Sequence, residues 1–215
     1  MENAEFTDRR SIDEMQEEVL HKAFGNEIRV TPRRLLEQIE GPDGVGKSTQ
    51  AKLLSKALNI PIIKATDKDD PVIKATYERA LACEGVERYL LFAWMRCNSL
   101  RDAKLLDMSI MDRGPISPIV YQGFMGGVDL KAILRIEREI FKDFRFKNII
   151  MLADKPYIRD NSNDSYDDYV WKNWPQFKQA YIKAGLMWDN NPIFIFCDNK
   201  TQEEVHKEIM ENFVG

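Results

Sequence analysis

Short apolar runs alternate with amphipathic segments along most of the chain. We expect strands at 35–39, 60–63, 109–111, 148–152 and 192–196, and helices at 49–58, 86–106, 130–141, 169–184 and 202–213. The run at 148–152 is suited to a central strand of a parallel sheet, because such strands are buried on both faces. Strands that alternate with helices build right-handed βαβ units. The pattern therefore predicts an α/β fold with a mainly parallel central sheet and helices on both faces.

The first 33 residues stand apart from this pattern. Ser11 and Glu14 have the spacing of a capping box, and apolar residues from Ile12 to Phe24 fall on one helical stripe. Such a helix either packs on the core or serves as an arm that docks a partner. We therefore divide the chain into an N-terminal helical extension at 1–33 and one domain at 34–215.

Composition is that of an ordinary globular protein. The chain has 215 residues, of which 44% are hydrophobic and 31% charged, and its net charge is −4. The sequence has no long basic run, which argues against a nucleic-acid partner without excluding a local basic groove. It also has no secretion signal and no apolar stretch long enough to span a bilayer, so we expect a cytoplasmic protein with no membrane partner.

A glycine-rich segment at 41–48 is the first candidate functional site. It reads Gly-Pro-Asp-Gly-Val-Gly-Lys-Ser and matches the P-loop pattern between an expected strand and an expected helix. In such a loop, backbone N–H groups converge on phosphates, the lysine reaches the β- and γ-phosphates, and the serine hydroxyl ligates Mg²⁺. The candidate ATP-binding residues are Gly41, Asp43, Gly44, Val45, Gly46, Lys47, Ser48 and Thr49.

A second candidate site follows the expected strand at 109–111. An acidic residue that ends a parallel strand lies at the carboxyl edge of the sheet, where ligands bind in such folds. Asp112 is therefore a candidate for holding Mg²⁺ through a water molecule, and Arg113 offers a fork of donors to a phosphate. An ion pair between these two neighbours within the loop is the alternative.

With these residues in view, the chain resembles the thymidylate kinase family from about residue 35 onward. The P-loop segment of that family is matched from Glu40 to Gln50, and its Leu-Leu-Phe-Ala-x-x-Arg helix is matched at 90–96. The family's Asp-Arg, Ser and Tyr-Gln-Gly elements follow in order at 112–123. Three ordered motifs at similar spacing are far more specific than any one of them.

The resemblance implies a P-loop kinase fold with a short lid, and a role for each matched residue. Asp43 would lie near the 3′-hydroxyl of the acceptor, Phe92 would stack on its base, and Arg96 would donate to the base edge. Arg113 would bind the acceptor phosphate, and Tyr121 would disfavour a 2′-hydroxyl. The acceptor-binding candidates are Asp43, Lys64, Phe92, Arg96, Arg113, Ser117 and Tyr121. The family also suggests a homodimer, with the helix at 86–106 as the contact surface.

The chain departs from the family in three places. The family's arginine after the second strand is absent, and Lys64 or Lys68 would have to replace it, although an ammonium does not reproduce a bidentate guanidinium contact. Gly114 stands where the family commonly has an aromatic residue or histidine. The expected lid at 154–168 has few basic residues, so Arg159 is the candidate lid arginine.

These features favour a kinase that transfers the γ-phosphoryl group of ATP, with Mg²⁺, to a deoxynucleoside monophosphate, and dTMP is the preferred acceptor. Its catalytic candidates are Lys47, Asp112, Arg113 and Arg159, with Ser48 and Asp112 as metal ligands. One alternative is a kinase of the same fold that phosphorylates a hydroxyl group, on a deoxynucleoside or a hydroxymethylated base in DNA. That reaction needs a general base, for which Glu40, Asp43 or Asp112 could serve. A second alternative is a nucleotide-binding interaction protein with little turnover.

Overall fold

The computed structural model of the protein describes residues 34–67, 69–156 and 165–214. The helical extension that we expect at 1–33, Lys68 and the lid residue Arg159 lie outside the described residues. The division of the chain at residue 33 and the lid therefore stay predictions. The fold that follows is that of the residues from Arg34 onward.

The centre of the fold is a five-stranded sheet in which every neighbouring pair of strands is parallel. The strands are β1 (Arg34–Glu40), β2 (Ile62–Lys64), β3 (Met108–Asp112), β4 (Phe144–Leu152) and β5 (Ile193–Phe196). Their spatial order is β2-β3-β1-β4-β5, so the first strand in the sequence is the middle one in space. This confirms the prediction of a parallel α/β sheet.

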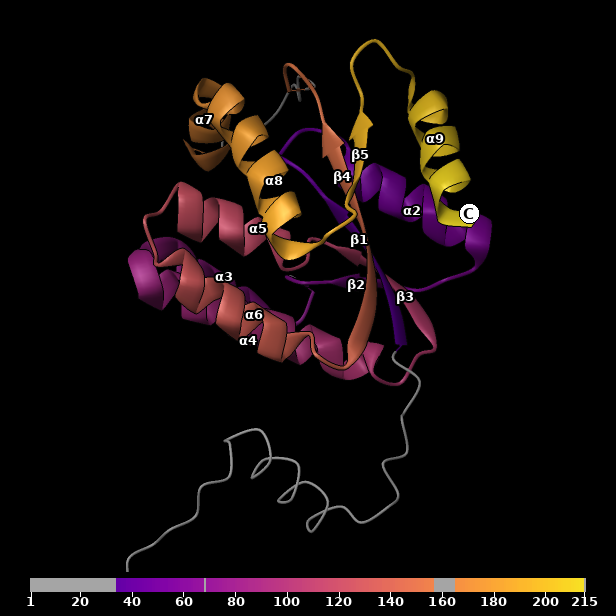
Figure 1. Ribbon diagram of the computed structural model, residues 1–215. Helices are drawn as coiled ribbons and strands as arrows, with labels where there is room; N and C mark the ends of the chain where they lie inside the picture. The colour runs from indigo at the N-terminus through magenta and orange to yellow at the C-terminus, as the bar shows by residue number, and fades with distance from the viewer. Residues whose placement is uncertain (1–33, 68, 157–164, 215) are drawn as a thin grey trace, which may run out of the picture. The chain divides into compact units, whose positions relative to one another are not determined.

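Helices cover both faces of the sheet (Figure 1). On one face α2 (Lys47–Leu58) packs beside α9 (Gln202–Val214). The other helices are α3 (Pro71–Ala82), α4 (Gly85–Ala103), α5 (Ile116–Pro118), α6 (Leu130–Ile140), α7 (Ser165–Lys172) and α8 (Trp174–Trp188), with a π-helical turn η1 (Ile119–Phe124) after α5. Among the described residues, none of the helices combines the length and the apolar character needed to cross a membrane.

Two helices differ from the sequence expectations. The prediction of a single helix at 169–184 is wrong. Two helices occupy this region, because α7 ends before Asn173 and α8 begins at Trp174. Pro175 lies in the first turn of α8, where its missing N–H costs nothing, whereas it would interrupt the interior of one long helix. The helix α3 was not expected at all, although Asp70 caps it by accepting from the N–H groups of Val72 and Ile73.

The central strand β1 is buried on both faces. Ile39 belongs to a cluster that includes Leu54 of α2, while Leu36 packs in a separate cluster with Phe141 and Phe144. The same strand also carries polar side chains that are withdrawn from water, namely Glu37, Gln38 and Glu40. Polar groups in this setting are costly unless they find partners, so each of them constrains the fold.

Glu37 is one of the incompletely paired side chains of this strand. Its side-chain atom Oε2 is buried without a hydrogen-bond partner, and the residue is 1% exposed. Burial raises the pKa of Glu37 to about 7, and the positive charge of Lys147, its neighbour in register on β4, opposes the rise. Between pH 4.5 and about 7 the folded chain therefore holds a proton at Glu37 that the unfolded chain has released.

We predict that Glu37→Gln makes the fold less sensitive to pH. The wild-type free energy of unfolding should fall as the pH rises from 4.5 to about 7, because the raised pKa favours the protonated folded state. At pH 8 the variant should be more stable than the wild type by up to about 3 kcal/mol. Urea denaturation at pH 5 and pH 8 measures this, with Glu139→Gln on the surface of α6 as control. An equal difference in stability at both pH values would contradict the prediction.

Candidate active site

The P-loop connects the carboxyl end of β1 to the first turn of α2. Gly41 has a φ of 142°, and a Cβ atom there would collide with the backbone carbonyl group of Met151 on β4. Only glycine allows the chain to turn this close to the neighbouring strand. The turn brings the N-terminus of α2, which begins at Lys47, to the carboxyl edge of the sheet, where its N–H groups favour an anion.

Lys47 is held across its own loop. Its Nζ donates to the carbonyl oxygen of Pro42 at 2.7 Å and lies 3.8 Å from Oδ1 of Asp43. The side chain is only 5% exposed, so its ammonium group is partly desolvated before any ligand binds. A charge in this position acts strongly on a phosphate that enters the loop.

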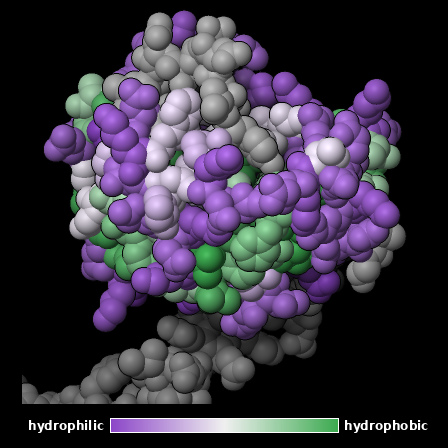
Figure 2. Space-filling model, turned by 90° about the horizontal axis from the view of Figure 1, so that it is seen from above, coloured by the Kyte–Doolittle hydropathy of each residue, from purple (hydrophilic) through white to green (hydrophobic). Residues whose placement is uncertain are grey.

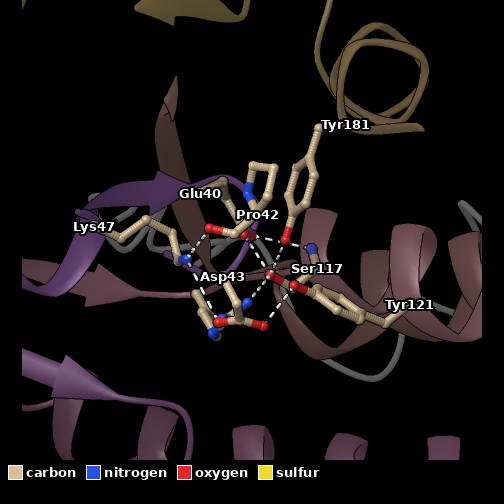
Figure 3. Close-up of polar contacts among 8 residues, drawn as sticks. Glu40, Pro42, Asp43, Lys47, Ser117, Tyr121 and Tyr181 are labelled. Carbon is tan, nitrogen blue, oxygen red and sulfur yellow. Dashed lines mark hydrogen bonds and ion pairs between the residues drawn. The ribbon is translucent and has the colours of Figure 1, made fainter. Parts of the chain in front are cut away.

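Glu40 joins the P-loop strand to the loop that follows β3 (Figure 3). Its Oε1 accepts from the backbone N–H groups of Gly114 at 2.7 Å, Ile116 at 3.1 Å and Ser117 at 3.3 Å. Its Oε2 accepts from the Ser117 hydroxyl at 2.6 Å. Burial raises the pKa of Glu40, and the hydrogen bond from Ser117 opposes the rise. Because Glu40 is fully buried and both oxygens are already used, it is not placed to serve as a general base.

Arg113 begins this second loop in an unusual backbone conformation. Its φ of 70° is in the left-handed region, which is uncommon for a residue other than glycine. The next residue, Gly114, packs closely against Gln38, and a Cβ atom there would lie 2.7 Å from Cδ of Gln38, so a larger residue would require the end of that side chain to move. The aromatic or histidine residue that the family commonly has at this position would therefore need Gln38 in another conformation.

Asp43 gathers the polar groups of both loops. It forms an ion pair with Arg113 and accepts a hydrogen bond of 2.7 Å from the Tyr121 hydroxyl, and Lys47 lies on its other side. The Arg113 guanidinium also lies over the Tyr121 ring, 5.5 Å from its centroid. In Figure 3, Asp43 and Lys47 of the P-loop lie beside Tyr121 from the segment after β3. Two cations thus share one carboxylate at the place where a phosphate would enter.

These side chains line one cavity of about 420 Å³. It contains most of the residues predicted from sequence: Asp43, Gly44, Gly46, Lys47, Ser48, Lys64, Phe92, Arg96, Asp112, Arg113, Ser117 and Tyr121. The fold therefore brings the motifs together, although Asp43 and Tyr121 are 78 positions apart in the sequence. The roles assigned to the individual residues stay predictions.

A second cavity of about 270 Å³ lies on the other side of the P-loop. Gly44 and Gly46 line both cavities, so the loop separates them. Val45 and Thr49, which we predicted as ATP-binding residues, line the second cavity together with side chains of the β5–α9 region such as Cys197 and Lys200. The site therefore has two compartments that meet at a phosphate-binding loop.

One helical face of α4 forms the far wall of the larger cavity. Phe92 and Arg96 are four residues apart and both line it, as the resemblance implied. Arg88, one turn before Phe92, also lines it and was missed, although the same four-residue spacing predicts its position. Tyr77 of α3 meets Phe92 edge to face, with 6.0 Å between ring centroids, and it was missed because α3 itself was not expected.

Lys64 lies at the rim of the same cavity rather than inside it. Its side chain is 53% exposed, and its Nζ is 3.6 Å from Oδ1 of Asp67 and 3.9 Å from Oδ2 of Asp69. Exposed pairs of this kind are weak, so Lys64 can leave its carboxylates for a stronger anion. It remains a candidate for the function of the arginine that the chain lacks after β2.

The predicted magnesium ligands fit such a role. Asp112 ends β3 beside the cavity, and its buried Oδ1 has no hydrogen-bond partner. Ser48 in the first turn of α2 lines the same cavity. Mg²⁺ commonly binds one or two protein oxygens and completes its shell with phosphate oxygens and water. These two side chains supply that kind of site.

The surface around the site is polar. Figure 2 views the molecule from above, toward the ends of β4 and β5 to which the arrows point in Figure 1. Hydrophilic side chains cover most of this face, and hydrophobic side chains gather in smaller areas between them. A polar face at the carboxyl edge of the sheet suits ligands that carry phosphate groups.

Comparisons with known proteins agree with this arrangement. The family model described as Thymidylate kinase matches residues 39–209. A probable thymidylate kinase of Methanococcus aeolicus is 30% identical over 195 residues, which cover 81% of this chain and 93% of the relative. The thymidylate kinase of Halothermothrix orenii is 25% identical over 209 residues, which cover 85% of this chain and 98% of the relative.

Solved structures give the same fold. The thymidylate kinase of Ehrlichia chaffeensis matches with a TM-score of 0.66 and 18% identity, over 86% of this chain and all of the other. The thymidylate kinase of Candida albicans matches with a TM-score of 0.64 and 21% identity, over 85% of this chain and 92% of the other. The prediction of the P-loop kinase fold is thereby confirmed.

We predict that Glu40→Gln destabilises the fold, in contrast to Glu37→Gln. An amide has one acceptor oxygen, which can take the place of Oε1, but its NH₂ group would then face the Ser117 hydroxyl that now donates to Oε2, and the negative charge that strengthens the other bonds would be lost. The loss of charge-assisted hydrogen bonds should lower the free energy of unfolding by about 2 kcal/mol. Urea denaturation at pH 8 measures both variants of β1 side by side. Unchanged stability of the Glu40 variant would show that the carboxylate does not hold the second loop.

Proposed function

Since the chain belongs to the thymidylate kinase family and is therefore an ATP-dependent nucleotide kinase, we propose that its phosphoryl acceptor is dTMP. The product would be dTDP. The observation that carries this proposal is the composition of the larger cavity, which the aromatic ring of Phe92 and the guanidinium groups of Arg96 and Arg113 all line.

Each of these groups corresponds to a part of a deoxynucleoside monophosphate. Phe92 offers a ring face for the base, and Arg96, one turn further along α4, offers N–H donors to its edge. Arg113 lies across the cavity beside the P-loop and would bind the acceptor phosphate. Tyr121 is fixed by its hydrogen bond to Asp43, so its ring would disfavour a 2′-hydroxyl on the sugar.

ATP would approach from the opposite side of the P-loop. Its triphosphate would lie along the loop and the N-terminus of α2, with Lys47 at the β- and γ-phosphates. The second cavity, beside Thr49 and Lys200, would receive the adenine. Magnesium held by Ser48, and through water by Asp112, would neutralise charge on the phosphates.

The protein needs little covalent chemistry for this transfer. The acceptor phosphate is already an anion, so no general base has to remove a proton from it. The chain would align the two phosphates in line and stabilise the charge that develops between them, chiefly through Lys47 and Arg113. Binding of the acceptor would draw Arg113 from Asp43, which would then be free to accept from the 3′-hydroxyl. Arg159 stays a prediction as the lid arginine.

An acceptor that is phosphorylated on a hydroxyl group is the main alternative. The missing arginine after β2 favours it, because a hydroxyl acceptor presents no phosphate for that arginine to bind. That reaction needs a base near the transferred phosphate. Glu40 is withdrawn from this role by its burial and hydrogen bonds, whereas Asp43 and Asp112 both line the cavity. The identity of the acceptor is therefore the decisive measurement.

We predict that turnover with Mg·ATP is restricted to dTMP and close analogues. ADP release should be measured against a panel of deoxynucleoside monophosphates, deoxynucleosides and DNA containing hydroxymethyluracil. Turnover of deoxynucleosides or of DNA alone would favour the hydroxyl acceptor instead. ATP binding without turnover across the panel would favour a nucleotide-binding interaction protein.

In the same assay, Lys47→Ala should lower kcat by more than about a hundredfold. The control is Lys52→Ala, which removes an exposed lysine of the same helix and should change kcat little.

We further propose that the protein is a homodimer that pairs through α4. Its residues Val86, Leu90 and Trp94 recur every four positions and are 58%, 51% and 44% exposed. This stripe lies on the opposite side of the helix from Phe92 and Arg96, so pairing through it leaves the cavity open.

We predict that Trp94→Glu separates the dimer. A charge at the centre of an apolar contact is costly to bury, so the mass in solution should fall from that of two chains to that of one. Sedimentation equilibrium of the full chain measures the mass. Leu186→Glu, at a similarly exposed position on α8, serves as the control and should leave the mass unchanged. A single-chain mass for the wild type would contradict the proposed dimer.

A further inference from the structure

A buried ion pair joins the wall of the acceptor cavity to a helix outside it. Arg96 of α4 is 4% exposed and Glu137 of α6 is fully buried. Glu137 accepts from Nε of Arg96 at 3.2 Å through Oε2, and from Nη2 through Oε1. The Tyr89 hydroxyl, on the same helix as Arg96, donates to Oε1 at 3.0 Å. Three hydrogen bonds thus fix one carboxylate against the guanidinium.

Burial makes this arrangement rigid. Burial raises the pKa of Glu137, and the adjacent Arg96 charge opposes the rise. Removal of either partner would leave an uncompensated charge in a low-dielectric region, which is strongly unfavourable. The pair therefore has no inexpensive alternative conformation, unlike the ion pair of Arg113 with Asp43, whose side chains are each 27% exposed beside the cavity.

The pairing with Glu137 determines which N–H groups of Arg96 remain for a ligand in the cavity. A guanidinium has five N–H groups in a plane, and Glu137 occupies the edge formed by Nε and Nη2. The remaining N–H groups belong to Nη1 and to the second hydrogen of Nη2. Arg96 lines the cavity one turn from Phe92, whereas Glu137 is not among the cavity-lining residues. At Arg96, the acceptor base therefore meets N–H donors only.

We propose that Glu137, assisted by Tyr89, is a positioning residue that fixes the direction of the Arg96 donors and thereby selects a base with an oxo group over one with an amino group at that edge. The inference rests on the proposed function, since it assumes that a nucleobase lies between Phe92 and Arg96. A pyrimidine oxo oxygen accepts from the fixed N–H groups. An exocyclic amino group would place donor against donor and lose its hydrogen bond to water in exchange.

The test is the selectivity of Glu137→Gln between dTMP and dCMP. The amide can accept through only one atom, and its NH₂ group would face an Arg96 N–H group, so the guanidinium should lose its orientation. We expect the KM for dTMP to rise about tenfold and the ratio of kcat/KM for dTMP over dCMP to fall by a similar factor, as expected for loss of one charge-assisted hydrogen bond. The KM for ATP should stay within about twofold.

Two further variants separate positioning from folding. Tyr89→Phe keeps both charges and removes one hydrogen bond to Glu137, so it should move selectivity in the same direction by about threefold while the chain stays folded. Glu139→Gln makes the same chemical change two residues along α6, at an exposed position, and should alter neither KM nor selectivity.

A double-mutant cycle completes the experiment. If Glu137 acts through Arg96, then Glu137→Gln should have no further effect on the KM for dTMP in an Arg96→Met background, where both charges are removed. An equal effect in both backgrounds, or an unchanged dTMP/dCMP ratio in Glu137→Gln and Tyr89→Phe, would overturn the inference and leave a purely structural ion pair. Absence of wild-type turnover with dTMP would instead reject the proposed acceptor, and the inference with it.

Discussion

A single buried carboxylate holds the two loops of the site together. Glu40 ends the central strand and accepts from three backbone N–H groups and one hydroxyl of the segment that follows β3. A carboxylate withdrawn from water requires such partners, so the position of the second loop is determined by the strand that begins the P-loop. Arg113 and Asp43, which flank these contacts in sequence, are brought face to face as a consequence.

Two arginines of the cavity are paired with carboxylates in different ways, and the difference suits their different tasks. The partner of Arg113 is Asp43, which itself lines the cavity, so an incoming phosphate can compete for the guanidinium. The partner of Arg96 is Glu137, which is fully buried and cannot be displaced by a ligand. An exchangeable pair suits the binding of a charged group, whereas a permanent pair suits the reading of an uncharged base edge.

Most of the fold could be predicted from the sequence, because strand and helix periodicity and the P-loop pattern are local signals. Local signals also explain the errors. Pro175 marks the start of α8 after the break, and Asp70 and Pro71 mark the start of α3, although neither signal lies within a strong apolar period. The buried pair of Arg96 with Glu137 had no such signal, because its members are 41 residues apart. In sequence, Glu137 is one of several charged residues between the apolar positions of α6, which usually face solvent.

The absent arginine after β2 changes where the positive charge of the cavity resides. Lys64, the residue left in that region, is half exposed and lies beside two aspartates. Arg88 of α4 instead donates to the carbonyl oxygens of Cys83 at 2.6 Å and Ala80 at 3.2 Å, at the end of α3. Carbonyl groups carry only partial charge, so they hold the guanidinium in place without cancelling it. Arg88 therefore adds a positive charge that a packed helix orders in advance, whereas Lys64, at the exposed end of β2, would have to become ordered on binding.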